Sequence, residues 1–118
     1  MSYSSTYYTG EVVSDVALEN GDSLILSGGT AVNTTMSGGN MKVFPREGAA
    51  LKTIMSGGSL YASGNFVKVE GTTLEAGAVF SAVDGVYVNS TTVNSGGSVN
   101  FRGSELNSTT VNTYGRVS

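Results

Sequence analysis

This chain of 118 residues contains no cysteine, no histidine and no tryptophan, and it has a single proline. The absence of cysteine excludes a disulfide framework, a thiol nucleophile and a thiolate metal site. Because histidine is absent as well, the usual catalytic triads and dyads and the usual transition-metal sites are excluded. An enzyme built from this chain would have to use carboxylates, lysine, arginine, tyrosine or serine.

Charged residues and long apolar runs are also scarce. Charged residues make up 13% of the chain, the net charge is -3, and the six Lys and Arg residues are scattered. The sequence therefore offers no basic surface for nucleic acid. No run approaches the ~18 apolar residues of a membrane-spanning helix, so we expect no membrane insertion of this segment. Residues 1–8 lack the basic start and apolar centre of a signal peptide, and we expect the chain to be a fragment of a longer protein.

What the chain has in place of these features is a repeat. A threonine column runs through Thr34, Thr53, Thr72, Thr91 and Thr109, with steps of 19, 19, 19 and 18 residues. An apolar column two places later runs through Met36, Met55, Leu74, Val93 and Val111. A second apolar column, beyond a glycine corner, runs through Leu24, Met41, Leu60, Val79, Val99 and Val117. Three columns in phase over successive units indicate a repeat architecture.

The local pattern within each unit predicts short strands. Around the glycine corner, apolar residues alternate with small polar ones, as in residues 91–95 and 98–101. Repeated glycine at one place marks a sharp bend made once per unit. Glycine, valine and threonine are abundant and no stretch keeps a helical apolar period, so we expect no substantial helix.

These observations predict an all-β protein, a parallel β-helix (β-solenoid) of about five to six coils with ~19 residues per coil. We expect a repeat domain over residues 12–118 and an N-terminal arm or cap over residues 1–11. Residues 16–18 take the place of the threonine and methionine columns in an irregular first coil. The only proline lies in residues 44–48, where we expect a corner or bulge, and residues 64–68 form a second irregular segment. The first apolar column should form one interior stripe.

The phrase TTVNSGGSVNF at residues 91–101, with the shorter forms TTMSGGNM, TIMSGGSL and TTLEAGAV, resembles the passenger repeat of diffuse-adherence (AIDA-type) autotransporter adhesins. The resemblance covers about residues 12–118. It implies a right-handed β-helical stalk displayed outside the outer membrane, and O-linked sugars on serine or threonine in some members. Localisation at the bacterial cell surface, as part of a longer exported protein, is what the resemblance implies for this chain.

The acidic residues do not form a paired set when they are aligned by the repeat. They occupy several columns on both sides of the corner: Asp15, Glu19, Asp22, Glu47, Glu70, Glu75, Asp84 and Glu105. We interpret them as solvated surface charge, and not as the carboxylate pair of a glycoside hydrolase. Only Gly21-Asp22-Ser23 places an Asp at the corner, which does not favour the calcium-binding turns of a β-roll. Three N-glycosylation sequons begin at Asn33, Asn89 and Asn107, and we attribute them to the repeat itself.

Aromatic residues offer two candidate contact surfaces. Five of them lie within the repeats and would form a sugar-stacking or protein-binding stripe if they faced outward, although such residues more often widen a core or close a corner: Tyr61, Phe66, Phe80, Tyr87 and Phe101. Tyr3, Tyr7 and Tyr8 lie before the repeats and are the better candidates for a contact surface.

We therefore expect a non-enzymatic, surface-exposed segment of an adhesin stalk that mediates cell adhesion or auto-aggregation. Its partners would be a host-cell or matrix surface or sister copies of itself. The alternative is a self-assembling subunit that stacks through exposed solenoid ends into oligomers or filaments, and a polysaccharide-active enzyme is a third hypothesis. We assign no catalytic, cofactor-binding or metal-binding residues and no cofactor.

Overall fold

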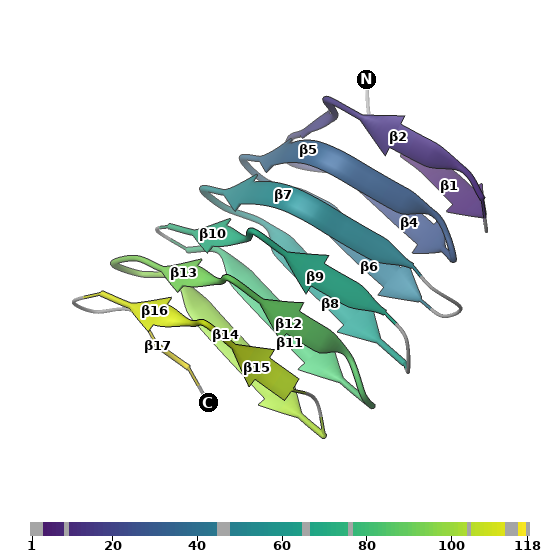
Figure 1. Ribbon diagram of the computed structural model, residues 1–118. Coiled ribbons are helices and arrows are strands. Elements are labelled where there is room, and N and C mark those ends of the chain that lie inside the picture. The colour runs from purple at the N-terminus through teal and green to yellow at the C-terminus, as the bar shows by residue number, and fades with distance from the viewer. Residues whose placement is uncertain are drawn as a thin grey trace.

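The computed structural model describes residues 4–8, 10–44, 48–64, 67–75, 77–103, 105–112 and 116–117. Within these ranges the protein is all-β, and its parallel strands stack as a solenoid of about five turns with equivalent residues about 19 apart. The predicted fold class is confirmed (Figure 1). Among the described residues, no helix is long and apolar enough to cross a membrane.

Two sheets face each other along the solenoid (Figure 1). Sheet A contains seven strands in chain order: β1 (Ser4–Tyr8), β4 (Ser23–Ser27), β6 (Asn40–Phe44), β8 (Ser59–Ser63), β11 (Val79–Val83), β14 (Ser98–Arg102) and β17 (Arg116–Val117). Sheet B contains the other ten: β2 (Val12–Ser14), β3 (Ala17–Leu18), β5 (Thr30–Met36), β7 (Ala49–Met55), β9 (Lys68–Glu70), β10 (Thr73–Leu74), β12 (Tyr87–Asn89), β13 (Thr92–Val93), β15 (Glu105–Asn107) and β16 (Thr110–Val111).

A bend divides sheet B lengthwise. The residue immediately before the threonine-column position of each coil has a positive φ, between 49° and 67°. These residues are Asp15, Asn33, Lys52, Gly71, Ser90 and Ser108. This left-handed conformation turns the chain without ending the ladder in β5 and β7, whereas in the other coils the strand breaks in two. The bend therefore forms a column of its own along the solenoid axis.

The interior holds side chains from alternate positions of both sheets. Met36, Met55, Leu74 and Val93 are fully buried in one row, which confirms this part of the expected stripe. Val111, the last member of that row, is 46% exposed because it lies in the last coil. Burying side chains of this size stabilises a fold by about 1.5–3 kcal/mol each, so the stacked rows are the main source of stability.

The second apolar column is wrong at one position. Val79 pairs with Ser59 and faces outward, whereas Phe80 pairs with Leu60 and is fully buried. The segment from Leu74 to Phe80 is one residue longer than the segment from Met55 to Leu60. Before β11 the Ala78 N–H donates to the Glu75 carbonyl at 2.9 Å. One extra residue shifts the pairing by one place, and this exchanges the two faces of the strand.

The start of the chain contributes to sheet A. Within residues 1–11, where we expect an arm or cap, β1 pairs in parallel with β4 over its full length. Ser5 and Tyr7 pair with Leu24 and Leu26, and Tyr7 packs against the core. The expected bulge at Pro45, the central residues of the segment 64–68, and the corner at 114–115 lie outside the described residues.

Candidate functional site: a groove along the bend of sheet B

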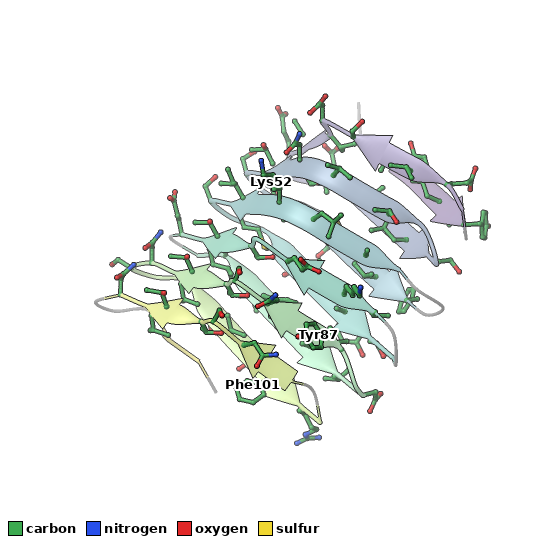
Figure 2. All side chains as sticks on the ribbon, viewed as in Figure 1. Lys52, Tyr87 and Phe101 are labelled. Atoms are coloured by element: carbon green, nitrogen blue, oxygen red, sulfur yellow. The ribbon has the colours of Figure 1, made fainter. Side chains whose placement is uncertain are left out.

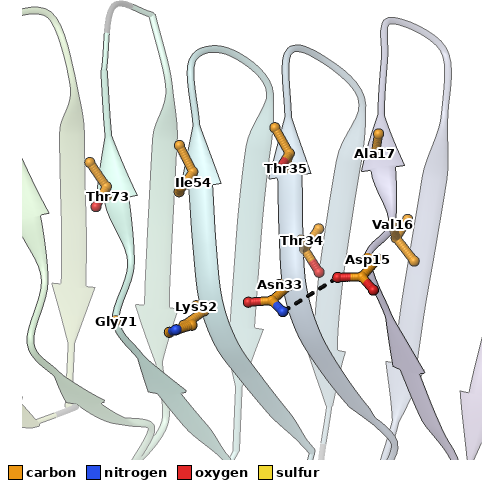
Figure 3. Close-up of a pocket in the computed structure, with 10 residues that line it drawn as sticks. All are labelled: Asp15, Val16, Ala17, Asn33, Thr34, Thr35, Lys52, Ile54, Gly71 and Thr73. Carbon is orange, nitrogen blue, oxygen red and sulfur yellow. Dashed lines mark hydrogen bonds between the residues drawn. The ribbon is translucent and has the colours of Figure 1, made fainter.

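A groove follows the bend column on the outer face of sheet B (Figure 3). Its main part encloses about 530 Å³ and is lined by Asp15, Val16, Ala17, Asn33, Thr34, Thr35, Lys52, Ile54, Gly71 and Thr73. A second hollow of about 300 Å³ shares Lys52 and Gly71 with it and extends to Glu70 and Ser90. Together they cross five consecutive coils, a length of ~19 Å at the ordinary strand spacing. We call this feature the axial groove.

The bend places polar side chains on the floor of the axial groove. Asp15 and Asn33 come from adjacent coils, and the Asn33 amide Nδ2 donates to the Asp15 carboxylate Oδ1 at 3.3 Å (Figure 3). Both residue types tolerate the left-handed conformation comparatively well, as does glycine at Gly71. A hydrogen-bonded carboxylate and amide thus stand at one end of the groove, open to solvent.

Lys52 occupies the same column one coil after Asn33. Its φ of 57° is uncommon for a lysine, which has no local hydrogen bond to offer the backbone in return. Among the described residues its ammonium makes no hydrogen bond or ion pair, although Glu70 lines the same smaller hollow. In Figure 3 the Lys52 side chain extends toward Gly71. A Cβ at Gly71 would lie 3.7 Å from Lys52 Cγ, an ordinary van der Waals contact, so the lysine stem does not require glycine there.

One wall of the axial groove is a row of outward side chains on the far side of the bend. Ala17, Thr35, Ile54 and Thr73 pair in register across β3, β5, β7 and β10. Ile54 is 51% exposed and is the largest apolar side chain of the wall. The wall therefore alternates hydroxyl groups with apolar patches from one coil to the next.

The acidic residues singled out in the sequence do not converge. Asp15 lies in the axial groove and Glu70 in its continuation, whereas Glu19, Glu75 and Asp84 are exposed at other places on the coil. Asp22 is buried at the corner, where its Oδ2 accepts a hydrogen bond from the Glu19 N–H at 2.7 Å. No group of three or more Asp or Glu residues that could hold a metal ion occurs among the residues described. Glu47 lies outside them.

The three sequon asparagines all occur on sheet B. Asn33 is exposed in the axial groove, while Asn89 and Asn107 pair with each other at the ends of β12 and β15 and are partly buried. Their common position just before or at the bend column supports their origin in the repeat.

The aromatic residues of the repeats that the structure describes do not form one outward stripe. Phe80 is fully buried, and Phe101 occupies the inward row of Ala62 and Ala82, where it is 39% exposed only because no complete coil covers it. Tyr61 lies on the outer face of sheet A. Tyr87 lies on the outer face of sheet B (Figure 2). Tyr61 and Tyr87 therefore face opposite sides of the solenoid. Phe66 lies outside the described residues.

The N-terminal tyrosines that the structure describes also differ in exposure. Tyr7 packs against the core and is partly buried, so it is not a contact residue, whereas Tyr8 is 61% exposed. Tyr3 lies outside the described residues.

Sheet A carries a separate hollow of about 400 Å³ beside Tyr61, lined also by Ser81, Asn100 and Arg102. Tyr61 is held there by an edge contact with Phe44, with ring centroids 6.4 Å apart. The hollow adjoins the incompletely covered last coil through Phe101, whereas the axial groove lies over central coils.

The axial groove was not predicted from the sequence, because strand alternation alone does not identify the residue before each threonine pair as left-handed. The signal was present: Asp, Asn and Gly, which tolerate a left-handed backbone, recur in that one column. Comparison of this chain with family models, with curated proteins and with solved structures finds no match.

Proposed function

We propose that this chain is a non-enzymatic, surface-exposed solenoid segment of an adhesin stalk that mediates adhesion or auto-aggregation. The observation that supports it best is the axial groove, which runs across five coils of a scaffold whose interior rows are fully buried. A rigid column with a continuous recognition surface suits binding to an extended partner. The resemblance of the repeat phrases to AIDA-type passengers points to the same role and to the bacterial cell surface.

The mechanism would be repeated weak contact along a rigid rod, in which no bond is made or broken. Side chains of one outward row recur once per coil, so a partner with its own repeat meets several equivalent contacts at once. Linked weak contacts raise the overall affinity because each later contact forms within an already associated pair. The partner would be a host-cell or matrix surface, or a sister copy.

Display of the chain on cells or beads that do not otherwise adhere tests this proposal. We expect attachment to cultured cells or matrix, or clumping of the beads, above the level given by the same display of Met55→Asp, which removes the folded solenoid. Equal attachment and equal clumping for the two displays would contradict an adhesive role.

A second candidate, end-to-end assembly, is favoured by the distribution of charge. Residues 1–41 contain four acidic residues and no lysine or arginine, whereas residues 42–118 contain five acidic residues and all six basic ones. Glu11, Asp15 and Glu19 are exposed in the first coil, and Arg102 is exposed in the last full coil beside the partly uncovered Phe101. Opposite charge at the two ends favours head-to-tail contact.

Analytical ultracentrifugation over a range of concentrations separates this candidate from the first. Head-to-tail assembly predicts a mass that rises with concentration and falls at high salt, since exposed charge pairs are screened. A monomer that persists at high concentration and low salt would contradict assembly. Incubation with neutral and acidic glycans tests the non-enzymatic assignment, which predicts no new reducing or unsaturated ends.

A further inference from the structure

We propose that Asn20 is a site of spontaneous modification, at which the folded chain converts the asparagine into isoaspartate and aspartate without an enzyme. The inference goes beyond the proposed adhesive function and does not rest on it. It is built on the turn that carries Asn20-Gly21, on the hydrogen bonds around that turn, and on the packing of the next coil against it.

Asn20 and Gly21 are the two central residues of the corner turn before β4. The turn is closed by two hydrogen bonds, because the Asp22 N–H donates to the Glu19 carbonyl at 2.9 Å and the Glu19 N–H donates to Asp22 Oδ2 at 2.7 Å. Both central residues are exposed, and among the described residues the Gly21 N–H has no hydrogen-bond partner. The Gly21 nitrogen is therefore open to solvent and is not held by the solenoid ladder.

The reaction joins the Gly21 nitrogen to the side chain of Asn20. The nitrogen bonds to Asn20 Cγ, the Cγ–Nδ2 bond breaks, and ammonia leaves with the proton of the Gly21 N–H, which gives a five-membered succinimide ring. Water then opens the ring at one of its two carbonyls. Opening at Cγ gives aspartate, whereas opening at the main-chain carbonyl gives isoaspartate, whose backbone is one methylene longer. Nothing is oxidised or reduced, and water is the only co-reactant.

Glycine allows this turn to approach the geometry of ring closure. Gly21 has a φ of 90° and Asn20 has no positive φ, which is the pattern of a type II turn. A type I turn differs from it mainly by a rotation of the central peptide, and glycine permits this rotation because it adopts either sign of φ. The rotation brings the Gly21 nitrogen closer to the asparagine side chain while the two residues that flank the pair stay in place.

Asn89 shows how the ladder prevents the same reaction elsewhere. It is followed by Ser90, whose N–H donates to the Asn107 carbonyl of the next coil at 3.1 Å. This hydrogen bond must break before a ring can close at Asn89. Asn20-Gly21 is also the only Asn-Gly pair in the sequence. The hydrogen bonds and the sequence therefore both distinguish Asn20 from Asn89.

Isoaspartate at position 20 would disturb the stacking of the first coil on the second. A Cβ placed on Gly38, in the next coil, would lie 2.8 Å from the Asn20 nitrogen and 3.0 Å from its Cα, so the two corners are already in close contact. A backbone lengthened by one methylene at this contact forces the two corners apart. The modification therefore loosens the first coil as the protein ages.

Incubation of the folded chain at mildly alkaline pH tests the proposal, with peptide mass spectrometry that separates isoaspartate from aspartate. We expect Asn20 to react at least about ten-fold faster than Asn89, a ratio that corresponds to ~1.4 kcal/mol in the activation barrier. In urea, which opens the ladder, the rate at Asn89 should rise more than the rate at Asn20.

An exchange of two residues between equivalent turns is the matched control. The corner before β14 has the same turn, in which the Gly97 N–H donates to the Asn94 carbonyl at 2.9 Å and Gly96 has a φ of 86°. Asn20→Ser should abolish the product at position 20, and Ser95→Asn should create a second product at position 95. Circular dichroism identifies any variant that has lost the fold.

A second variant separates the new charge from the longer backbone. Freshly prepared Asn20→Asp carries the charge on a backbone of normal length, so we expect the aged chain, rich in isoaspartate, to melt at a lower temperature than this variant. A reaction at Asn20 that occurs only in urea would overturn the proposal, as would folded Ser95→Asn that gives no product. Equal melting temperatures for the aged chain and Asn20→Asp would overturn the loosening of the first coil.

Discussion

The central coils and the last coil contain the same rows of residues but bury them differently. Met55 is fully buried between the coils on either side of it, whereas Val111 in the same row is 46% exposed. Ala62 and Ala82 are fully buried, and Phe101 in their row is 39% exposed. The contrast shows that one coil of about 19 residues has no core of its own, and that burial comes from the coil stacked on each side.

We expect the largest change in the free energy of unfolding when a charge is placed in the apolar row that contains Met55 and Val111. Met55→Asp buries a carboxylate with no partner and should destabilise the fold by about 3–5 kcal/mol or unfold it. Val111→Asp should cost less than about 1 kcal/mol, because its side chain is already half in water. Urea unfolding followed by circular dichroism measures both. Ser56→Asp, next to Met55 but exposed, is the control that should be near neutral.

A smaller effect is expected from glycine at the corners. Gly58 and Gly103 both have positive φ, 81° and 66°, so alanine strains the backbone at either position. At Gly58 the added Cβ would also lie 2.7 Å from the Gly38 and Gly39 carbonyl oxygens of the preceding coil, whereas at Gly103 the nearest atom is 3.9 Å away. Gly58→Ala should therefore cost about 1–3 kcal/mol more than Gly103→Ala. Equal melting temperatures for the two variants would contradict this close approach of the coils.

The smallest predicted effect is an increase in stability, whereas the two effects above are losses. Thr34, Thr53, Thr72 and Thr91 are buried in the interior, and their hydroxyl oxygens have no hydrogen-bond partner among the residues that the structure describes. Thr72→Val should therefore raise the free energy of unfolding by about 1 kcal/mol, since it removes an unsatisfied polar group at similar size. Thr109 in the last coil is half-buried, and its Oγ1 donates to the Asn107 carbonyl at 3.5 Å. Thr109→Val should give no gain, and denaturant midpoints compare the two.

The fold could be predicted from the sequence because each coil repeats the same apolar positions, and stacked coils bury those positions in continuous rows. One apolar residue recurs about every 19 residues, and stacking of the coils places its copies in one buried row: Met36, Met55, Leu74 and Val93. The failure at Val79 and Phe80 has a specific cause: both are apolar, so the pattern could not reveal that the corner before them is one residue longer. The strand at Ser4–Tyr8 was missed because Ser5 and Tyr7, which pair with Leu24 and Leu26, do not continue the aliphatic column in the sequence.

The candidate site was less accessible to sequence reasoning. The alternation of strand residues indicates which face a side chain takes, but it does not indicate that one residue per coil is left-handed and opens a groove. Asp15, Asn33 and Gly71 are consistent with such a bend, yet Lys52 in the same column conceals it, because lysine has no preference for that conformation.

Pulsed electron paramagnetic resonance on spin-labelled pairs tests most directly whether successive coils stack in register. The chain has no cysteine, so labels attach only where cysteine is introduced. Ala17, Thr92 and Thr110 belong to one outward row of sheet B and are separated by whole coils. Labels at 17 and 92 should lie ~19 Å apart, and labels at 17 and 110 ~24 Å apart, one strand spacing more. A separation that does not increase by about one strand spacing, or a broad distribution of distances in the folded chain, would contradict the stacked solenoid.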